Sequence, residues 1–264
     1  MKKLLLIFLP FFLSCGAQKP STNAPKPLFS RIDFHAHYNF ERDSLPALFQ
    51  SWNMRAVLIQ VALGDSLRDQ KNWEEMVKHY QDFPDQFFLC SGFEGTGIDE
   101  TNYAAKKIEM IQKHITDGAR MVKVWKNFGM VTQDVSGKYI QIDDPRLQPI
   151  WDYLTENDIP VIAHIGEPLQ AWRELEHRIL YGTDLGTDEP QQNLSPENRQ
   201  NELNYLKKIL SVDWAYFSGK DSMIYDSPMI SFPVATEGLN LPDSVLHKFY
   251  YENAAKILKI ENGD

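Results

Sequence analysis

The stretch Arg31–His37 (RIDFHAH) places an acid and two histidines at alternate positions, Asp33, His35 and His37. On an extended strand, residues two and four positions apart lie on the same face, so the three side chains are expected to point the same way. Two imidazoles on one strand face can reach a single cation at about 2.1 Å. Asp33 is then expected to accept the second N–H of a ligating histidine and fix its tautomer. The alternative is a polar strand edge with two exposed histidines.

The first 28 residues have the pattern of a targeting signal followed by a flexible linker. A basic start is followed by an apolar run over residues 4–13, which is too short to cross a bilayer as a helix. We predict a bacterial lipoprotein signal peptide over residues 1–14, lipidation of Cys15 and a flexible tether over 15–28. The alternative is an ordinary secretory signal. The lipoprotein prediction puts one folded domain, residues 29–264, in the bacterial cell envelope.

Composition restricts the partners of this domain. The whole chain carries a formal charge of −9, which becomes −11 without residues 1–14, because they hold two lysines and no acid. An acidic chain is unsuited to binding nucleic acid or anionic lipid headgroups. We therefore expect a small-molecule substrate, no nucleic acid, and membrane attachment only through the lipid on Cys15. Cys90 lies in an apolar run and is expected to be a buried thiol without a disulfide partner.

The remaining chain alternates between apolar runs and amphipathic segments. Five apolar runs are predicted strands: 32–35, 55–61, 87–93, 119–125 and 160–164. The segments between them are predicted helices: 43–52, 71–81, 101–114 and 144–157. Apolar strands without polar alternation, separated by amphipathic helices, predict a parallel sheet that is covered on both faces.

Several of these strands end in a residue that can do chemistry. Beyond the first strand, Lys123 lies in the fourth, His164 ends the fifth, and a later apolar run over 178–184 ends in Asp184. Such groups at the C-terminal ends of parallel strands are typical of a (β/α)-barrel active site. Each signal alone is weak, since a lone strand-end histidine is usually a satisfied polar residue and a lone aspartate is usually a turn or cap residue. Together they predict one site.

These motifs resemble the amidohydrolase superfamily, in particular its amidohydrolase-related, decarboxylase-like family. The matching segments are IDFHAH (32–37), GARMVK (118–123), VIAHIG (161–166), ILYGTD (179–184) and YENAAKIL (251–258). The resemblance implies a TIM-barrel-like α/β fold with one or two divalent metals, commonly zinc. It implies His35, His37, His164 and Asp184 as metal ligands, with Asp184 also taking the proton of the attacking water.

Other residues near these motifs leave alternatives open. By the same resemblance Lys123 is a carboxylated bridge between two metals, a substrate contact, or a residue without a role in the site. Glu167 and Arg173 could contact substrate or belong to a solvated loop, which is the commoner outcome. His177 has the pattern of a helix end and is not assigned as a ligand.

The chain is too short for a complete barrel of this family. Only 14 residues separate His164 from Ile179, whereas one βα unit needs about 30. Two strands are therefore missing, including the sixth, which in the family normally brings another histidine. About six strands are predicted. The sheet then stays open, is closed by a second chain in a homo-oligomer, or belongs to an internally deleted and inactive copy.

The chain after Asp184 is predicted to be less regular. A helix is expected from residue 195 to about 210, followed by an aromatic stretch over 213–217. Residues 222–237 are predicted to be irregular and to form either a substrate lid or a packed surface loop. A final helix is expected from residue 242 to 258 or 260.

The sequence therefore predicts a metal-dependent hydrolase of the amidohydrolase type. It would attack a C–N or ester bond of a small molecule with a water activated by the metal, most simply zinc. A metal-dependent decarboxylase that uses the same site is the first alternative. The second alternative is a catalytically degenerate lipoprotein that keeps only the scaffold. A histidine ligand from the sixth strand would separate these alternatives, and the sequence gives no clear candidate for it.

Overall fold

The computed structural model describes residues 29–38, 40–64, 66–163, 180–187, 189–226 and 232–260. The predictions for Cys15, His164, Glu167, Arg173 and His177 lie outside these residues. The chain divides into two compact units, one holding residues 26–207 and 242–264 and the other including residues 208–241. Each unit is described by itself. Within the described ranges, no helix is long and apolar enough to cross a membrane.

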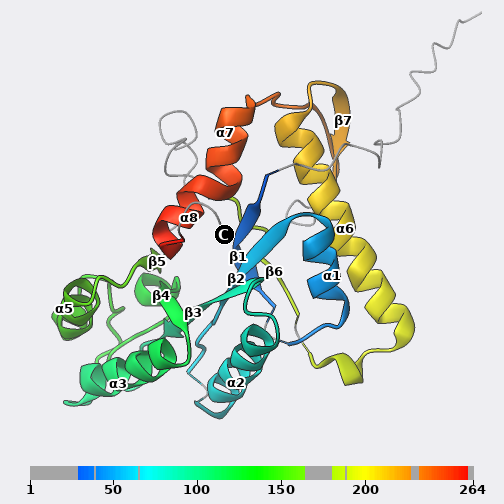
Figure 1. Cartoon of the computed structure of the whole chain (residues 1–264). Coiled ribbons are helices and arrows are strands. Elements are labelled where there is room, and N and C mark those ends of the chain that lie inside the picture. The colour runs from blue at the N-terminus through cyan, green and yellow to red at the C-terminus, as the bar shows by residue number, and fades with distance from the viewer. Residues whose placement is uncertain are drawn as a thin grey trace, which may run out of the picture. The chain divides into compact units, whose positions relative to one another are not determined.

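The larger unit is built on six described strands, all parallel to their neighbours (Figure 1). They are β1 (Arg31–His37), β2 (Met54–Ile59), β3 (Phe87–Phe93), β4 (Ala119–Val124), β5 (Val161–Ala163) and β6 (Leu185–Gly186). Their spatial order is β5-β4-β3-β2-β1-β6, so the first five follow chain order and the last returns to the free side of β1. This is the arrangement of a (β/α) half-barrel and confirms the predicted incomplete TIM-barrel-like fold.

The outer face of this sheet is covered by the crossover helices. They are α1 (Ser44–Ser51), α2 (Ser66–Asp82), α3 (Tyr103–Thr116) and α5 (Gln148–Glu156), which follows the short η1 (Pro145–Leu147). A single helical turn, α4 (Asn127–Met130), follows β4. Apolar side chains of α3 and α5 pack with Phe93, Val122 and Val124 of the strands. The predicted alternation of strands and helices is confirmed to within a few residues at most boundaries.

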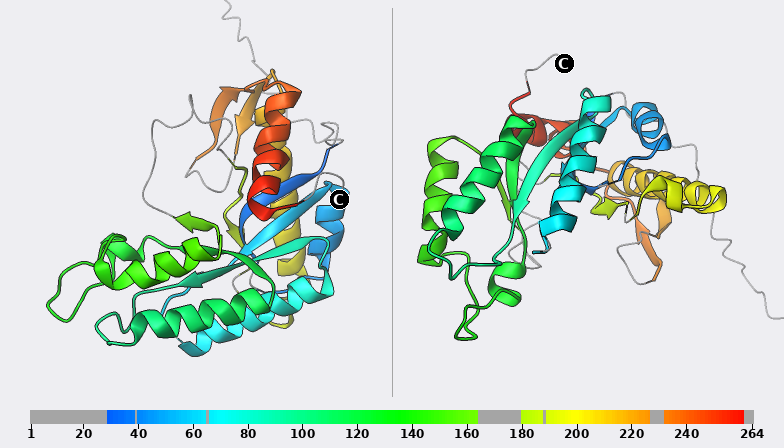
Figure 2. Two further views of the ribbon diagram at one scale, coloured as in Figure 1. Left: turned by 60° about the vertical axis from the view of Figure 1, so that its left-hand side comes forward. Right: turned by 90° about the horizontal axis from the view of Figure 1, so that it is seen from below.

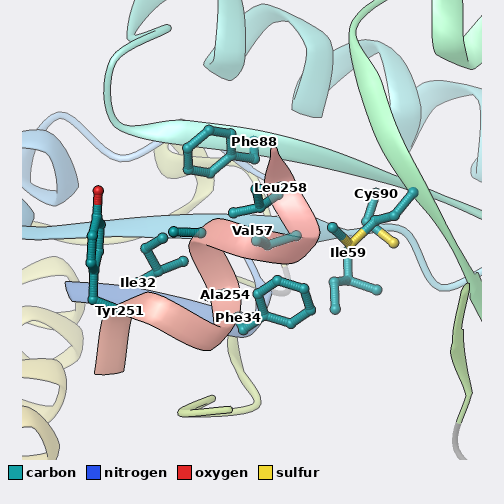
Figure 3. Close-up of a cluster of buried hydrophobic side chains, with 11 residues drawn as sticks. Ile32, Phe34, Val57, Ile59, Phe88, Cys90, Tyr251, Ala254 and Leu258 are labelled. Atoms are coloured by element: carbon teal, nitrogen blue, oxygen red, sulfur yellow. The ribbon is translucent and has the colours of Figure 1, made fainter. Parts of the chain in front are cut away.

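The opposite face of the sheet is covered by the end of the chain. The final helical segment consists of α7 (Asp243–His247), the π-helical turn η4 (Lys248–Glu252) and α8 (Asn253–Leu258). Its buried side chains form one cluster with residues from β1 to β4 (Figure 3): Ile32, Phe34, Val57, Ile59, Phe88, Cys90, Met121, Tyr251, Ala254, Ala255 and Leu258. Met121 in this cluster and Val122 in the outer one are neighbours on a strand, so the two clusters lie on opposite faces. Figure 2 (left) shows the red helix and helices α2 and α3 on opposite sides of the strands.

This packing gives the inner face of the half-barrel an apolar partner within the same chain. The inner face, which in a closed barrel would be buried against the opposite strands, is buried instead against α8. Burial of apolar surface is the main favourable contribution to folding, and it needs no particular partner geometry. The inner face of the described sheet is thus covered within one chain.

The chain after Asp184 departs from the prediction in two places. Helix α6 runs from Pro196 to Ser218, so the predicted end near residue 210 was wrong and the aromatic stretch 213–217 is helical. The apolar spacing of Leu210, Trp214 and Phe217 continues the helical period and is the physical reason. Residues 222–237, predicted to be irregular, form an antiparallel hairpin of β7 (Ser222–Tyr225) and β8 (Val234–Glu237) as far as they are described. The role of this segment as a lid stays a prediction.

Candidate metal centre

Three of the predicted ligands converge at the C-terminal end of the sheet. The Nε2 atoms of His35 and His37 lie 3.1 Å apart. One carboxylate oxygen of Asp184 lies 3.3 Å from the first and 3.0 Å from the second. The side chains are 30%, 18% and 46% exposed in that order, so the group is reachable from solvent.

This donor set fits a divalent cation. Two ligands of a tetrahedral ion, each about 2.1 Å from it, lie roughly 3.4 Å apart, which is close to the separations found here. Imidazole nitrogen and carboxylate oxygen are ordinary ligands of Zn²⁺ and related ions. The grouping of His35, His37 and Asp184 was predicted from the sequence, whereas the identity of the metal stays a prediction.

His37 is held in the tautomer that a ligand needs. Its Nδ1 atom lies 3.0 Å from the carbonyl oxygen of Ile59 at the end of β2. A carbonyl oxygen can only accept, so Nδ1 carries the proton and donates it. The lone pair of a neutral imidazole is then on Nε2, the atom that faces Asp184. For His37, the orienting role that we assigned to Asp33 therefore belongs to a backbone carbonyl.

Asp33 does not share the face of the two histidines, so that prediction was wrong. Asp33 pairs with Ala56 and Ala36 pairs with Leu58, so three residues of β1 span two of β2. This extra residue interrupts the alternation, because a bulge shifts every later side chain by one position. Asp33 lies on the face of Ala36, and both histidines lie on the other. It is fully buried and accepts hydrogen bonds from the backbone and hydroxyl of Thr183.

Asp184 has an unusual backbone conformation. Its φ is +55°, in the left-handed region that residues other than glycine seldom adopt. The strand predicted over 178–184 is not formed by its described residues 180–184, and the paired strand β6 begins only at Leu185. The close contact with His37, together with the nearby His35 and Lys123, holds the pKa of the Asp184 carboxyl below its usual value, although partial burial opposes this.

Lys123 is the buried cation of the site. It is only 3% exposed and follows Met121 by two positions, so it lies on the inner face of the sheet. Burial lowers the pKa of its ammonium group, and the nearby Cys90 and Asp184 oppose that effect. The prediction that Lys123, not Lys126, points inward is confirmed, since Lys126 is exposed.

The remaining predictions have different outcomes. Cys90 is buried and free, as expected, and burial raises the pKa of its thiol. His164, the fourth predicted ligand, lies directly after the described part of β5 and outside the described residues. Sequence reasoning missed Thr183 and the Ile59 carbonyl. The glycines at positions 182 and 186, which bracket Thr183 and Asp184, were the available signal for a close backbone approach.

No family model matches the chain, and no curated protein matches it. Two solved structures are similar. The crystal structure of 2,6-dihydroxybenzoate decarboxylase from Rhizobium shares 14% identity over 70% of this chain and 62% of that chain, with a TM-score of 0.42. A complex of 2,6-dihydroxybenzoate decarboxylase with 2,6-dihydroxybenzoate shares 15% identity over the same fractions, with a TM-score of 0.36. The chain thus spans less than two thirds of the length of the decarboxylase that it matches.

Proposed function

We propose that this chain is a divalent-metal enzyme of the amidohydrolase type that removes the carboxyl group of a small organic acid. The observation that carries the proposal is the convergence of His35, His37 and Asp184 beside the buried ammonium group of Lys123. The three donors would hold the ion. Lys123 adds a positive charge on the inner face, which suits an anionic substrate.

The side chains of the site have separable roles in this reaction. A bound divalent ion supplies Lewis acidity toward a substrate oxygen. Lys123 binds the negative charge of the substrate in a buried place where Coulomb attraction is stronger than in water. The bond between carbon and carboxylate breaks, CO₂ leaves, and the carbon keeps the electron pair. That carbon then takes a proton, for which the Lys123 ammonium group is the buried donor.

Hydrolysis of an amide or ester is the second candidate, and a different observation favours it. The histidine contacts keep Asp184 in its charged form, and 46% of its side chain is exposed. A carboxylate of this kind can accept a proton from an attacking water and deliver it to the leaving group. This is the reaction that we expected from the sequence.

One experiment separates the two reactions. The zinc-loaded and manganese-loaded protein is incubated with a panel of small aromatic and aliphatic carboxylic acids, among them 2,6-dihydroxybenzoate, and with a matched panel of their amides and esters. The proposal expects CO₂ from at least one acid, which is lost in a His35→Ala/His37→Ala variant. Cleavage of the amides or esters without CO₂ release would overturn the decarboxylase proposal in favour of hydrolysis. Turnover of neither panel would favour the degenerate scaffold.

A further inference from the structure

We infer that Asp33 and Thr183 are positioning residues that hold Asp184 against the two histidines. The inference rests on the proposed metal site. It assigns the buried acid of the first motif a role other than the one we expected from the sequence. It also explains why the segment before β6 carries both small and hydroxylated residues.

The contacts of Thr183 fix the backbone on both sides of Asp184. Asp33 Oδ1 accepts from the Thr183 amide at 2.9 Å, and its Oδ2 accepts from the Thr183 hydroxyl at 2.6 Å. The same hydroxyl oxygen accepts from the amide of Leu185 at 3.2 Å. Asp184 itself donates from its amide to the carbonyl oxygen of His35 at 2.7 Å. The backbone amides of Thr183, Asp184 and Leu185 therefore all donate hydrogen bonds, which fix the backbone around Asp184.

This arrangement compensates for an unfavourable conformation. A left-handed backbone is unfavourable for a residue other than glycine, and the hydrogen bonds of the neighbouring residues hold Asp184 in it. Asp33 is fully buried and Thr183 nearly so, which means that their hydrogen bonds do not compete with water. A change of the Asp184 backbone would turn its carboxylate away from the Nε2 atoms.

The flanking glycines let the segment approach the histidines closely. A Cβ atom on Gly182 would lie 2.6 Å from Cβ of His35. A Cβ atom on Gly186 would lie 2.8 Å from the carbonyl oxygen of His37 and 3.0 Å from its Cβ. Residues 182–186 therefore form a cradle that fits directly against the two histidines. The hydrogen bonds between Asp33 and Thr183 hold this cradle in place.

The test is a double-mutant cycle on metal affinity. Zn²⁺ and Co²⁺ dissociation constants are measured by competition with a chromophoric chelator for the unaltered protein and for Thr183→Val, Thr183→Ser, Asp184→Ala and Thr183→Val/Asp184→Ala. Removing the orienting partner of a ligand typically weakens metal binding about 10–100-fold. We expect at least a tenfold loss for Thr183→Val and less than about threefold for Thr183→Ser, which keeps the hydroxyl.

The cycle distinguishes positioning from general stability. If Thr183 acts through Asp184, Thr183→Val has no further effect on affinity in the Asp184→Ala background, although it lowers the unfolding temperature in both backgrounds. The visible spectrum of the Co²⁺ form should also change in Thr183→Val toward that of Asp184→Ala. Unchanged affinity in Thr183→Val, or equal losses in both backgrounds, would overturn the inference and leave the metal site standing. Absence of metal binding by the unaltered protein would overturn the proposed function as well.

Discussion

Arg120 donates a hydrogen bond from Nη1 to the carbonyl oxygen of Leu258, 2.8 Å away, and so joins β4 to the last turn of the final helix. A cationic donor at a helix C-terminus satisfies a carbonyl that has no partner within the helix. Lys259, which follows, has a φ of +55° and ends the helix in the left-handed conformation. The guanidinium group of Arg120 also lies over the ring of Phe88 at 5.1 Å. The helix that covers the inner face is therefore fixed at its end as well as along its length.

Loss of packing under this helix is expected to be costly. Leu258 is 1% exposed and belongs to the inner cluster. Replacement of such a residue by alanine removes apolar burial and leaves a cavity, so Leu258→Ala should lower the free energy of unfolding by about 2–5 kcal/mol. Lys256→Ala, an exposed change on the same helix, serves as the control and should stay within about 0.5 kcal/mol. Equal urea midpoints for the two variants would contradict the role of the helix as the inner layer.

Acid should destabilise the fold through two buried histidines. Burial lowers the pKa of His79 to about 4, and burial lowers the pKa of His114 to about 4. Both values lie below the unfolded value of about 6.5, so the folded state disfavours the proton. The stability that neutral histidine provides is complete above pH 6.5 and is lost as the pH falls toward 4. Each should contribute roughly 2 kcal/mol of loss between pH 7.5 and 5.

Urea unfolding at these two pH values measures that loss. His79→Met keeps an apolar group against Phe83 and Phe87 and has no proton to gain. Between pH 7.5 and 5, the histidine-linked loss of unfolding free energy should be about half as large in this variant as in the unaltered protein. The reason is that only His114 can still take up a proton. If the unfolding free energy depends on pH equally in the variant and in the unaltered protein, protonation of His79 does not destabilise the fold.

The charge of Lys123 should affect the binding of substrate and should not affect the binding of metal. Lys123→Met removes the buried cation while keeping an unbranched apolar side chain of similar length. We expect the inhibition constants of simple aromatic carboxylates to rise at least about tenfold, because a charged hydrogen bond in a buried place is worth about 1.5–3 kcal/mol. Metal content should stay near that of the unaltered protein. Lys126→Met, an exposed control, should change neither quantity. Loss of metal in Lys123→Met alone would make Lys123 part of the metal centre.

Close approach at Gly182 should be essential to the site. Gly182→Ala places a methyl group 2.6 Å from Cβ of His35, which is too close for any real contact, so the segment must move. Metal affinity should fall by an order of magnitude or more. Gly137→Ala is a matched control, because Gly137 has a φ of +82° and nothing within 4 Å of the added atom. That change should lower the free energy of unfolding without changing the metal affinity. Normal metal affinity in Gly182→Ala would argue against the cradle.

The sequence predicted those parts of the molecule that depend on local pattern. Apolar runs and amphipathic spacing are local properties, and they predicted the first five strands of the half-barrel and the crossover helices. The grouping of His35, His37 and Asp184 was predicted from their places at the ends of apolar runs, because parallel strands end at the same edge of the sheet, and from the family resemblance. The inward orientation of Lys123 followed from strand alternation.

The failures arise where distant parts of the chain decide the outcome. The bulge in β1 depends on its pairing with β2, so alternation within β1 alone put Asp33 on the wrong face. Coverage of the inner face by α8 depends on contacts between residues far apart in the sequence, such as Leu258 and Val57. The predicted end of α6 near residue 210 was wrong because the aromatic stretch 213–217 was treated as a separate segment, although it continues the apolar spacing of the helix. Thr183 carries no motif of its own, and its contacts with Asp33 cross 150 positions of sequence.

The most direct test of the account is the metal content of the purified protein, measured by elemental mass spectrometry beside the His35→Ala/His37→Ala variant. We predict about one equivalent of zinc or a similar divalent ion in the unaltered protein after reconstitution, and its loss in a variant that unfolds at a comparable temperature. Equal metal content in the two proteins, or no metal in the unaltered protein after reconstitution, would contradict the claim that these histidines form a metal centre.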